Sequence, residues 1–417
     1  MSTTSFTNLI TLTDAAWFNN ADKAAYGYLT GVAGTNTITA TGPASLSAYA
    51  AGNKFHFVPA ATNTGATTIN ITQSGASALG AKNVFFNGAA CVGGEIKIGV
   101  PCLIIYDGTQ FQLVESALDK TAPTCGRLTL TTALPVTTAD VTGATTVYFT
   151  PYKGNVVSLY DGAAWVSTVF TELSQTTADN TKSPAAVANN SNYDIFVWND
   201  AGTLRATRGP AWTSDTARGA GAGTTELEML EGRYVNKIAI TNGPAARRGL
   251  YVGTIRSNGI AQINDALTAR HVWNNYNRVM RPMRAVDTTD TWTYTTDTFR
   301  QANAAAANQV DAVFGLSEDV VAVEVRINAN GTGAAYATPG IGISNTVTQA
   351  AQIVQPAFLN STNVPMLGAA KYRGFPGIGR YYFVWLERST ASGITTWRGD
   401  GGDSTQTQSG ISGEIFA

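Results

Sequence analysis

The residues best suited to acid–base catalysis are scarce in this sequence. It contains only two histidines, His56 and His271. His56 stands between Phe55 and Phe57 in an alternating pattern, so we expect it on the outer face of a strand. His271 lies among arginine and tryptophan residues, where packing or a hydrogen bond accounts for it. Because nucleophilic catalysis needs a base beside the nucleophile, and no Gly-x-Ser-x-Gly turn is present, no serine or cysteine active site is predicted.

Paired carboxylates are the second chemistry to weigh, because glycosidases cleave polysaccharide with two acids. The nearest pairs are Glu226 with Glu228, Glu318 with Asp319, and Asp400 with Asp403. Glu318 and Asp319 precede a strand, whereas Asp400 and Asp403 lie in a glycine-rich turn, where weak calcium binding is an alternative. None of the pairs stands out from the acids that turns ordinarily carry. We therefore expect no catalytic residue, no cofactor and no enzymatic activity.

Metal chemistry has as little support as catalysis. Three scattered cysteines, Cys91, Cys102 and Cys125, and two histidines do not make a transition-metal site. The odd number of cysteines and the absence of a Cys-x-x-Cys spacing also argue against a disulfide framework. We expect three reduced, buried thiols and no bound metal.

Positive charge is concentrated between residues 247 and 284. The arginines of this stretch are Arg247, Arg248, Arg256, Arg270, Arg278, Arg281 and Arg284. One interpretation is a basic patch for an anionic glycan or a nucleic acid. The other is a contact zone between subunits, in which arginine pairs with acids or stacks on aromatic rings. We favour the second, and its expected interface residues are Arg270, Trp273, Tyr276, Arg278 and Arg281.

Composition predicts a mainly β protein. Charged residues make up 13% of the 417 residues, and Gly, Ala, Thr, Ser and Asn fill the gap, which suits strands and tight turns better than solvated helices. Two Tyr-Asp-Gly turns, at 106–108 and 160–162, each lie between strand patterns, and such turns are strong hairpin signals. A third hairpin is predicted with its turn at 199–202, and further strands at 320–327 and 380–387. The expected architecture is a series of small antiparallel β modules followed by a jelly-roll-like C-terminal β-sandwich.

The first residues predict a short helix instead. Thr13 or Asp14 is a suitable N-cap, and Trp17, Ala21, Ala25 and Tyr28 then follow on one face. This helix either covers the first β module or docks on another protein. No apolar run reaches the roughly 18 residues that span a bilayer, and the start lacks the pattern of a cleaved signal peptide. With a net charge of −1, no general attraction to nucleic acid is expected, and no membrane insertion.

Several short motifs resemble a family of fibre and appendage proteins of tailed bacteriophages. They are residues 34–40, 63–71, 106–111, 147–154, 158–162, 273–279 and 396–401. The resemblance covers most of the chain and carries no catalytic residues. It implies β-rich homotrimers on the virion, assembled in the host cytoplasm, and leaves tail and head positions open.

The helix, strand and charge patterns along the chain divide it into five expected segments. They are 1–33, a helical virion-attachment segment, with Trp17, Phe18 and Tyr28 as contacts; 34–118 and 119–260, two β modules; 261–289, an Arg- and aromatic-rich connection; and 290–417, the sandwich. The implied function is a homotrimeric fibre subunit that attaches by its N-terminus to other virion proteins of the tail, portal-proximal region or capsid. Its C-terminal domain would contact a host surface glycan through Tyr336, Tyr372 and Trp397. The alternatives are a head fibre or capsid decoration protein and a polysaccharide depolymerase spike.

Overall fold

The computed structural model describes residues 27–86, 88–91, 93–114, 123–162, 164–333, 335–354 and 364–417, and the backbone of 358–359. Within these residues the protein is mainly β, as the composition predicts, and its one helical element is the 3-10 turn Ala302–Ala304. The predicted N-terminal helix lies mostly outside the described residues. Its last part is not helical, because Thr30–Ala33 forms strand β1. No helix of the described residues is long and apolar enough to cross a membrane.

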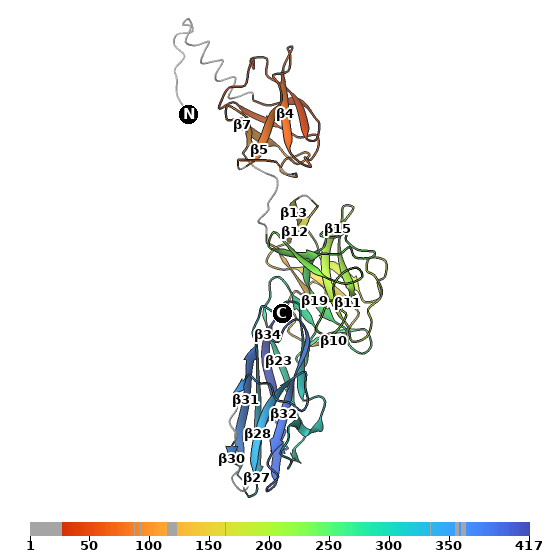
Figure 1. The fold of residues 1–417 in the computed structure, drawn as a ribbon, viewed down its shortest axis with the longest axis vertical. Coiled ribbons are helices and arrows are strands. Elements are labelled where there is room, and N and C mark those ends of the chain that lie inside the picture. The colour runs from red at the N-terminus through yellow and green to blue at the C-terminus, as the bar shows by residue number, and fades with distance from the viewer. Residues whose placement is uncertain are drawn as a thin grey trace. The chain divides into compact units, whose positions relative to one another are not determined.

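The chain forms two units, each described by itself. The first contains residues 1–122 together with the hairpin turn 160–167, and the second contains 123–159 and 168–417. The boundaries expected near residues 260 and 290 therefore fall inside the second unit. Figure 1 shows the strands of the first unit in red and orange, and those of the second from yellow to blue.

One curled sheet builds the first unit. Its order is β1-β2-β4-β5-β8-β7-β3, and β6 pairs with β5. Beyond β1, the strands are β2 (Thr37–Gly42), β3 (Lys54–Phe57), β4 (Thr67–Gln73), β5 (Lys82–Phe86), β6 (Ala89–Ala90), β7 (Cys102–Tyr106) and β8 (Phe111–Leu113). A bridge between Tyr28 and His56 brings the start of the sheet against its last strand, so the sheet curls into a barrel-like form. The expected all-antiparallel module is wrong in detail, because β2 with β4 and β5 with β8 are parallel.

The Tyr-Asp-Gly hairpins form as predicted, and the aspartate explains why. Asp107 accepts hydrogen bonds from the backbone N–H groups of Thr109 (2.8 Å) and Gln110 (2.9 Å), which fixes the turn between β7 and β8. Gly108 has φ +108°, which a residue with a side chain rarely adopts. Asp161 does the same for Ala164 N–H (2.9 Å) between β12 (Val156–Tyr160) and β13 (Trp165–Val169).

Three larger sheets make up most of the second unit. The six-stranded sheet has the order β16-β15-β19-β18-β17 with β22 on β19. Its strands are β15 (Asn192–Asp200), β16 (Thr203–Ala211), β17 (Leu227–Leu230), β18 (Arg233–Asn236), β19 (Leu250–Arg256) and β22 (Val272–Asn274). The hairpin of β15 and β16 is the third one that the sequence predicts. A small sheet, β14-β11-β9, adds β9 (Gly126–Thr129), β11 (Thr146–Pro151) and β14 (Leu173–Thr176).

The other two sheets build the C-terminal sandwich. The eight-stranded sheet, β10-β20-β21-β26-β32-β28-β30 with β25, contains β10 (Val141–Ala144), β20 (Ile263–Ala266), β21 (Ala269–Arg270), β25 (Arg300–Gln301), β26 (Gln309–Phe314), β28 (Tyr336–Ile343), β30 (Phe358–Leu359) and β32 (Gly379–Ser389). The seven-stranded sheet, β23-β34-β27-β31-β29 with β33 and β24, contains β23 (Met280–Val286), β24 (Thr291–Thr293), β27 (Val321–Gly331), β29 (Ile353–Val354), β31 (Met366–Gly374), β33 (Thr395–Arg398) and β34 (Gly410–Phe416).

Both sheets of the sandwich share one core with the six-stranded sheet. Phe196, Tyr251 and Trp273 belong to the same buried cluster as Trp385 and Ile411. Residues 261–289 are therefore not a connecting stem but strands β20 to β23. Pro282 lies inside β23, where proline is tolerated because β23 is the edge strand of its sheet.

Candidate functional site

The arrangement closest to an acid–base site is the pair of His271 and Asp311. Strand β21 runs parallel to β26 with Ala269 opposite Asp311, so the loop after β21 carries His271 to this carboxylate. Nε2 of His271 lies 3.5 Å from Oδ1 of Asp311, and the imidazole is buried. In a catalytic triad the carboxylate and the nucleophile bind opposite nitrogens of the imidazole, so with Asp311 at Nε2 the nucleophile's hydroxyl or thiol would have to lie at Nδ1. Nδ1 of His271 is buried without a hydrogen-bond partner among the described residues, so the pair lacks a nucleophile.

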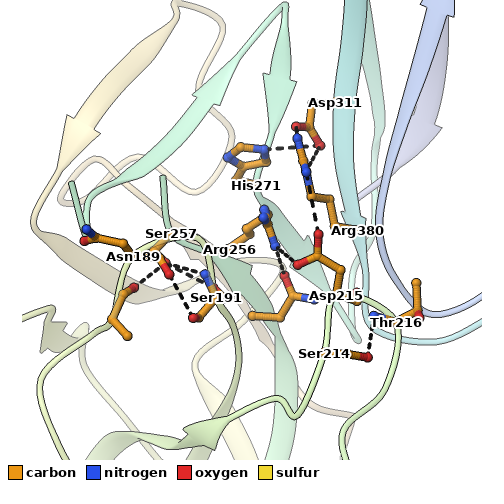
Figure 2. A network of polar contacts seen from close by, with 12 residues as sticks. Asn189, Ser191, Ser214, Asp215, Thr216, Arg256, Ser257, His271, Asp311 and Arg380 are labelled. Carbon is orange, nitrogen blue, oxygen red and sulfur yellow. Dashed lines mark hydrogen bonds and ion pairs between the residues drawn. The ribbon is translucent and has the colours of Figure 1, made fainter. Parts of the chain in front are cut away.

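The same pair is one end of a polar network, shown in Figure 2. Arg380 of β32 clamps Asp311 through Nη2 (2.6 Å) and Nε (2.9 Å), and its Nη1 lies 3.6 Å from Asp215. Asp215 follows β16, and its carboxylate accepts a hydrogen bond of 2.7 Å from Nη1 of Arg256. Arg256 also donates to the side-chain oxygen of Asn192 at 3.0 Å. The network therefore joins the six-stranded and eight-stranded sheets.

The electrostatics of the network favour a structural role. Burial raises the pKa of Asp311, but the contacts with His271 and Arg380 outweigh burial, so the net pKa is lowered. Asp311 therefore stays ionised and has no proton to give. Two arginines balance two aspartates, and each ion has its partner within the chain. This arrangement holds strands of two sheets together and offers no vacant reacting position.

The arginines between residues 247 and 284 do not form one patch. Arg270 and Arg281, both buried, share Asp265 at 2.9 and 3.0 Å, and Arg270 also donates to the backbone oxygen of Pro282. Arg247 instead pairs with Glu228 at 2.8 Å on the surface. The expected stacking and pairing of arginine thus occur, but inside one chain.

This burial corrects part of the expected subunit interface. Arg270, Trp273 and Arg281 are 4%, 0% and 5% exposed within a single chain, so they have no surface left for a partner. Arg278 is half-buried, pairs with Glu318 (2.9 Å) and Asp319 (2.6 Å), and lies over the Trp273 ring at 5.0 Å. Burial raises the pKa of Tyr276 to about 12. An interface role for Tyr276 and Arg278 stays a prediction.

The candidate carboxylate pairs are likewise occupied. Arg278 forms ion pairs with both Glu318 and Asp319, whereas Lys237 binds Glu226 at 2.5 Å. Asp403 accepts from the backbone and side chain of Thr405, so it closes its own turn. Within the described part of the chain no three His, Cys, Asp or Glu residues come together to hold a metal ion. The three cysteines are buried and free of disulfides.

Of the three aromatic residues expected at a receptor, only one is accessible. Tyr336 is 40% exposed at the start of β28. Tyr372 and Trp397 are 4% and 0% exposed, so the expectation that they contact a receptor is wrong. Their strands alternate in the opposite phase: Tyr372 points into the core beside Phe383, and Trp397 lies opposite Trp292 in the ladder of β24 and β33. For virion attachment, Tyr28 is exposed, and Trp17 and Phe18 lie outside the described residues.

An open surface exists on the seven-stranded sheet, on the side away from the core. We call it the outward face, and it consists of Met280, Pro282, Arg284, Val286, Ala322, Glu324, Arg326, Asn328, Leu367, Ala369, Lys371, Arg373, Gly410, Ser412, Glu414 and Phe416. Alternation along β23, β27, β31 and β34 puts these side chains outward and their neighbours into the core. A groove of about 650 Å³ runs over the face and is lined by Arg284, Glu324, Lys371, Arg373 and Glu414.

The acidic partners of the buried arginines are what the sequence analysis missed. Asp194 is fully buried, and its carboxylate accepts hydrogen bonds from Nε of Arg218 at 2.6 Å and from the hydroxyl of Thr254 at 2.7 Å. One local signal was available: Asp194 interrupts the apolar run of β15, and a carboxylate inside a buried strand requires a partner. Asp311 gives the same signal, because Val310 and Ala312 on either side of it in β26 are apolar and fully buried. For Asp215 no comparable signal exists, since Ser214 and Thr216 beside it are polar and exposed.

Comparisons with known proteins give no family. No protein-family model matches the chain, and no curated protein matches it. Among solved structures, one titled "Structure of infectious bursal disease virus Gx strain" is 9% identical, covers 72% of this chain and 78% of its own, and has a TM-score of 0.21. A second, "SGBP-B from a complex xyloglucan utilization locus in Bacteroides uniformis", is 11% identical over 87% of this chain and 99% of its own, with a TM-score of 0.09.

Proposed function

We propose that this chain is a non-catalytic structural subunit of a tailed-phage virion: a homotrimeric fibre that attaches by its N-terminal part and contacts the host surface by its C-terminal sandwich. The observation that carries the non-catalytic part is the occupation of the acids. The closest approach to an acid–base pair, His271 with Asp311, is neutralised by Arg380 and lacks a nucleophile. The virion and fibre parts rest on the motifs that resemble the phage family.

A contact with a host glycan would use side chains at the exposed end of the sandwich. Tyr336 is 40% exposed and Ile394 is 51% exposed. Tyr336 begins β28 and Ile394 follows β32, and the hydroxyl of Ser389 at the end of β32 donates a hydrogen bond to the backbone oxygen of Tyr336. Aromatic and aliphatic surface of this kind suits weak contacts with sugar faces, and three copies would raise avidity without new chemistry.

The test is location and adsorption. Gold-labelled antibody against the purified chain should decorate the fibres of the virion, and the purified chain should compete with phage for adsorption to cells. Label confined to the capsid would favour a decoration protein instead. Haloes on host lawns that disappear when Glu318 and Asp319 are both changed to the amides would overturn the non-catalytic assignment in favour of a depolymerase.

A further inference from the structure

The outward face of the seven-stranded sheet is basic, although the chain as a whole is not. Four basic residues stand on this face against two acidic ones. They are Arg284, Arg326, Lys371 and Arg373 against Glu324 and Glu414. The face therefore has a net charge of +2 in a chain whose net charge is −1. This excess of positive charge favours a negatively charged partner over a second copy of the same face.

Two of the four cations have no acidic partner within the chain. Glu324 forms ion pairs of 2.7 and 3.5 Å with its two basic neighbours on the face. Arg284 and Arg373 are both exposed, and neither forms an ion pair with another described residue. Arg284 donates a hydrogen bond to the neutral side chain of Gln408. Two guanidinium groups are thus open to a ligand, and their planar set of donors suits a carboxylate or a phosphate.

The register of the sheet places these two arginines on opposite sides of the groove. Arg284 of β23 lies opposite Ser412 of β34, and Arg373 of β31 lies opposite Ala322 of β27. Since β34 and β27 lie between β23 and β31, three strand spacings of about 4.8 Å separate the two outer backbones, roughly 14 Å in all. Ser412 and Ala322 have small side chains, so they form the floor of the groove, and the longer arginine side chains line its sides.

One acidic residue in the floor narrows the chemistry of the ligand. Glu414 lies opposite Ala322, lines the groove and forms no ion pair with another described residue. A nucleic-acid strand carries a phosphate charge about every 3.4 Å, so one laid along the groove would place a phosphate beside this carboxylate. A sugar hydroxyl, in contrast, is a donor that a carboxylate accepts. Two guanidinium groups around one carboxylate therefore fit a ligand with both acidic groups and hydroxyls.

The size of the groove also suits such a ligand. Its volume of about 650 Å³ lies within the range of about 300–1,000 Å³ that is usual for small-molecule sites. Lys371 lines the groove as well, and its side chain is 63% exposed, so a third cation is within the same hollow.

We propose that the groove of the outward face binds an acidic saccharide. Arg284 and Arg373 bind carboxylates of the sugar from the two sides, and Glu414 accepts hydrogen bonds from its hydroxyls. The proposal rests on the proposed function, in which the C-terminal sandwich contacts a host-surface glycan. It adds the chemical class of that glycan and a surface that binds it.

Binding of matched oligosaccharides to the full chain tests the proposal. The acidic probes are a galacturonate tetramer and a sialic-acid tetramer, and the neutral control is the galacturonate tetramer with its carboxylates methyl-esterified. Calorimetric titration should show binding of at least one acidic tetramer and at least about tenfold weaker binding of its neutral form, because a lost charge-assisted hydrogen bond costs about that much.

Substitutions in the groove test the individual contacts. Arg284→Gln and Arg373→Gln should each weaken binding of the acidic tetramer about tenfold, while the circular dichroism and melting match the wild type. Arg248→Gln makes the same change in the loop between β18 and β19, outside the groove, and should leave the affinity unchanged. Glu414→Gln should weaken binding of the acidic tetramer but strengthen binding of inorganic polyphosphate, because it removes an acceptor for hydroxyls and a charge that repels phosphate.

The outcomes separate this proposal from the proposed function. If neither acidic tetramer binds, or if the methyl ester binds equally well, the acidic-saccharide site is wrong, and labelling of fibres with competition for adsorption would still support the function. Tighter binding of polyphosphate than of either tetramer would assign the groove to a polyanion. A lower assembled mass of either arginine variant in sedimentation would assign the face to a subunit contact. Saccharide binding through both arginines by a chain that is absent from the virion would keep the groove and overturn the function.

Discussion

The two units of this protein are stabilised in different ways. In the first unit, aliphatic and aromatic side chains fill the curled sheet. The ring of Phe111 packs against those of Tyr49 and Tyr106, with ring centroids 5.2 and 5.1 Å apart. No ion pair joins two of the described residues of this unit. In the second unit, buried ion pairs run through the core as well: Asp194 with Arg218, and Asp265 with two arginines.

The difference teaches what each kind of contact demands from the sequence. An apolar core forms from alternating side chains that pair through short hairpins, and many combinations of similar volume fill it. A buried ion pair must satisfy both charges, because either one left alone is strongly unfavourable. The second unit joins strands far apart in the chain, and its ion pairs lie at those junctions: Arg218 also donates to the backbone oxygen of Gly315 at 2.8 Å.

The largest expected effect comes from breaking the most buried ion pair. Asp194→Asn removes the charge that balances Arg218, whose side chain is only 9% exposed. We expect the second unit to lose about 4 kcal/mol of unfolding free energy, since a buried charge is left without its partner. Hydrogen-exchange mass spectrometry in denaturant follows peptides of each unit separately. Peptides of the first unit should exchange as in the wild type.

The matched control is an exposed pair in the same unit. Asp297 and Arg388 are 56% and 43% exposed and lie 2.8 Å apart. Asp297→Asn should cost less than about 1 kcal/mol, because exposed ion pairs contribute little. Equal losses from the two variants would show that burial does not distinguish these pairs.

The next largest effect belongs to the apolar core of the first unit. Ile104 of β7 is fully buried, whereas Ile105 points to the other face and is half-buried. Ile104→Ala should lower the unfolding free energy of the first unit by about 3 kcal/mol through the cavity it leaves, and Ile105→Ala by less. A denaturation curve of each variant measures both values. Similar losses at the two positions would contradict the assigned alternation.

The same contrast explains how far the sequence could be interpreted. Hairpins were predictable because their turns are local: Asp107 and Gly108 act within four residues, and so do Ala201 and Gly202. The partners of the arginines were not predictable, because they lie more than a hundred residues away in the sequence. Arg127 donates to the backbone oxygen of Ala417, and Arg281 donates to the hydroxyl of Thr137. The phase of a strand is also set from afar. Tyr372 and Trp397 were assigned to the surface, and the sheets that pack on them turned both inward.

A smaller effect on stability is expected from Asp179, and this effect depends on pH. Burial raises the pKa of Asp179, but hydrogen bonds from Gln175, Thr181 and the Lys182 backbone outweigh it and bring the pKa to about 2. Since this folded-state pKa lies below the unfolded value near 3.8, the stabilisation is present above pH 4 and is lost as the pH falls towards 2. We expect Asp179→Asn to cost at most about 2 kcal/mol at pH 6. The difference from the wild type should shrink at pH 2.5, and melting curves at both values check it.

The smallest expected change in stability comes from a turn residue that contributes neither to the apolar core nor to a buried ion pair, so it tests backbone conformation alone. The turn of β15 and β16 has Ala201 at φ +50° and Gly202 at φ +97°, and a Cβ added to Gly202 would meet no atom within 4 Å. Gly202→Ala should therefore cost about 1 kcal/mol for the left-handed backbone alone. Ala201→Gly should change stability little or favourably, because glycine relieves the same strain at the neighbouring position. If thermal melting shows Gly202→Ala to be as stable as the wild type, the two-residue turn with positive φ is wrong, and with it the register that places Asp200 opposite Thr203 in the hairpin of β15 and β16.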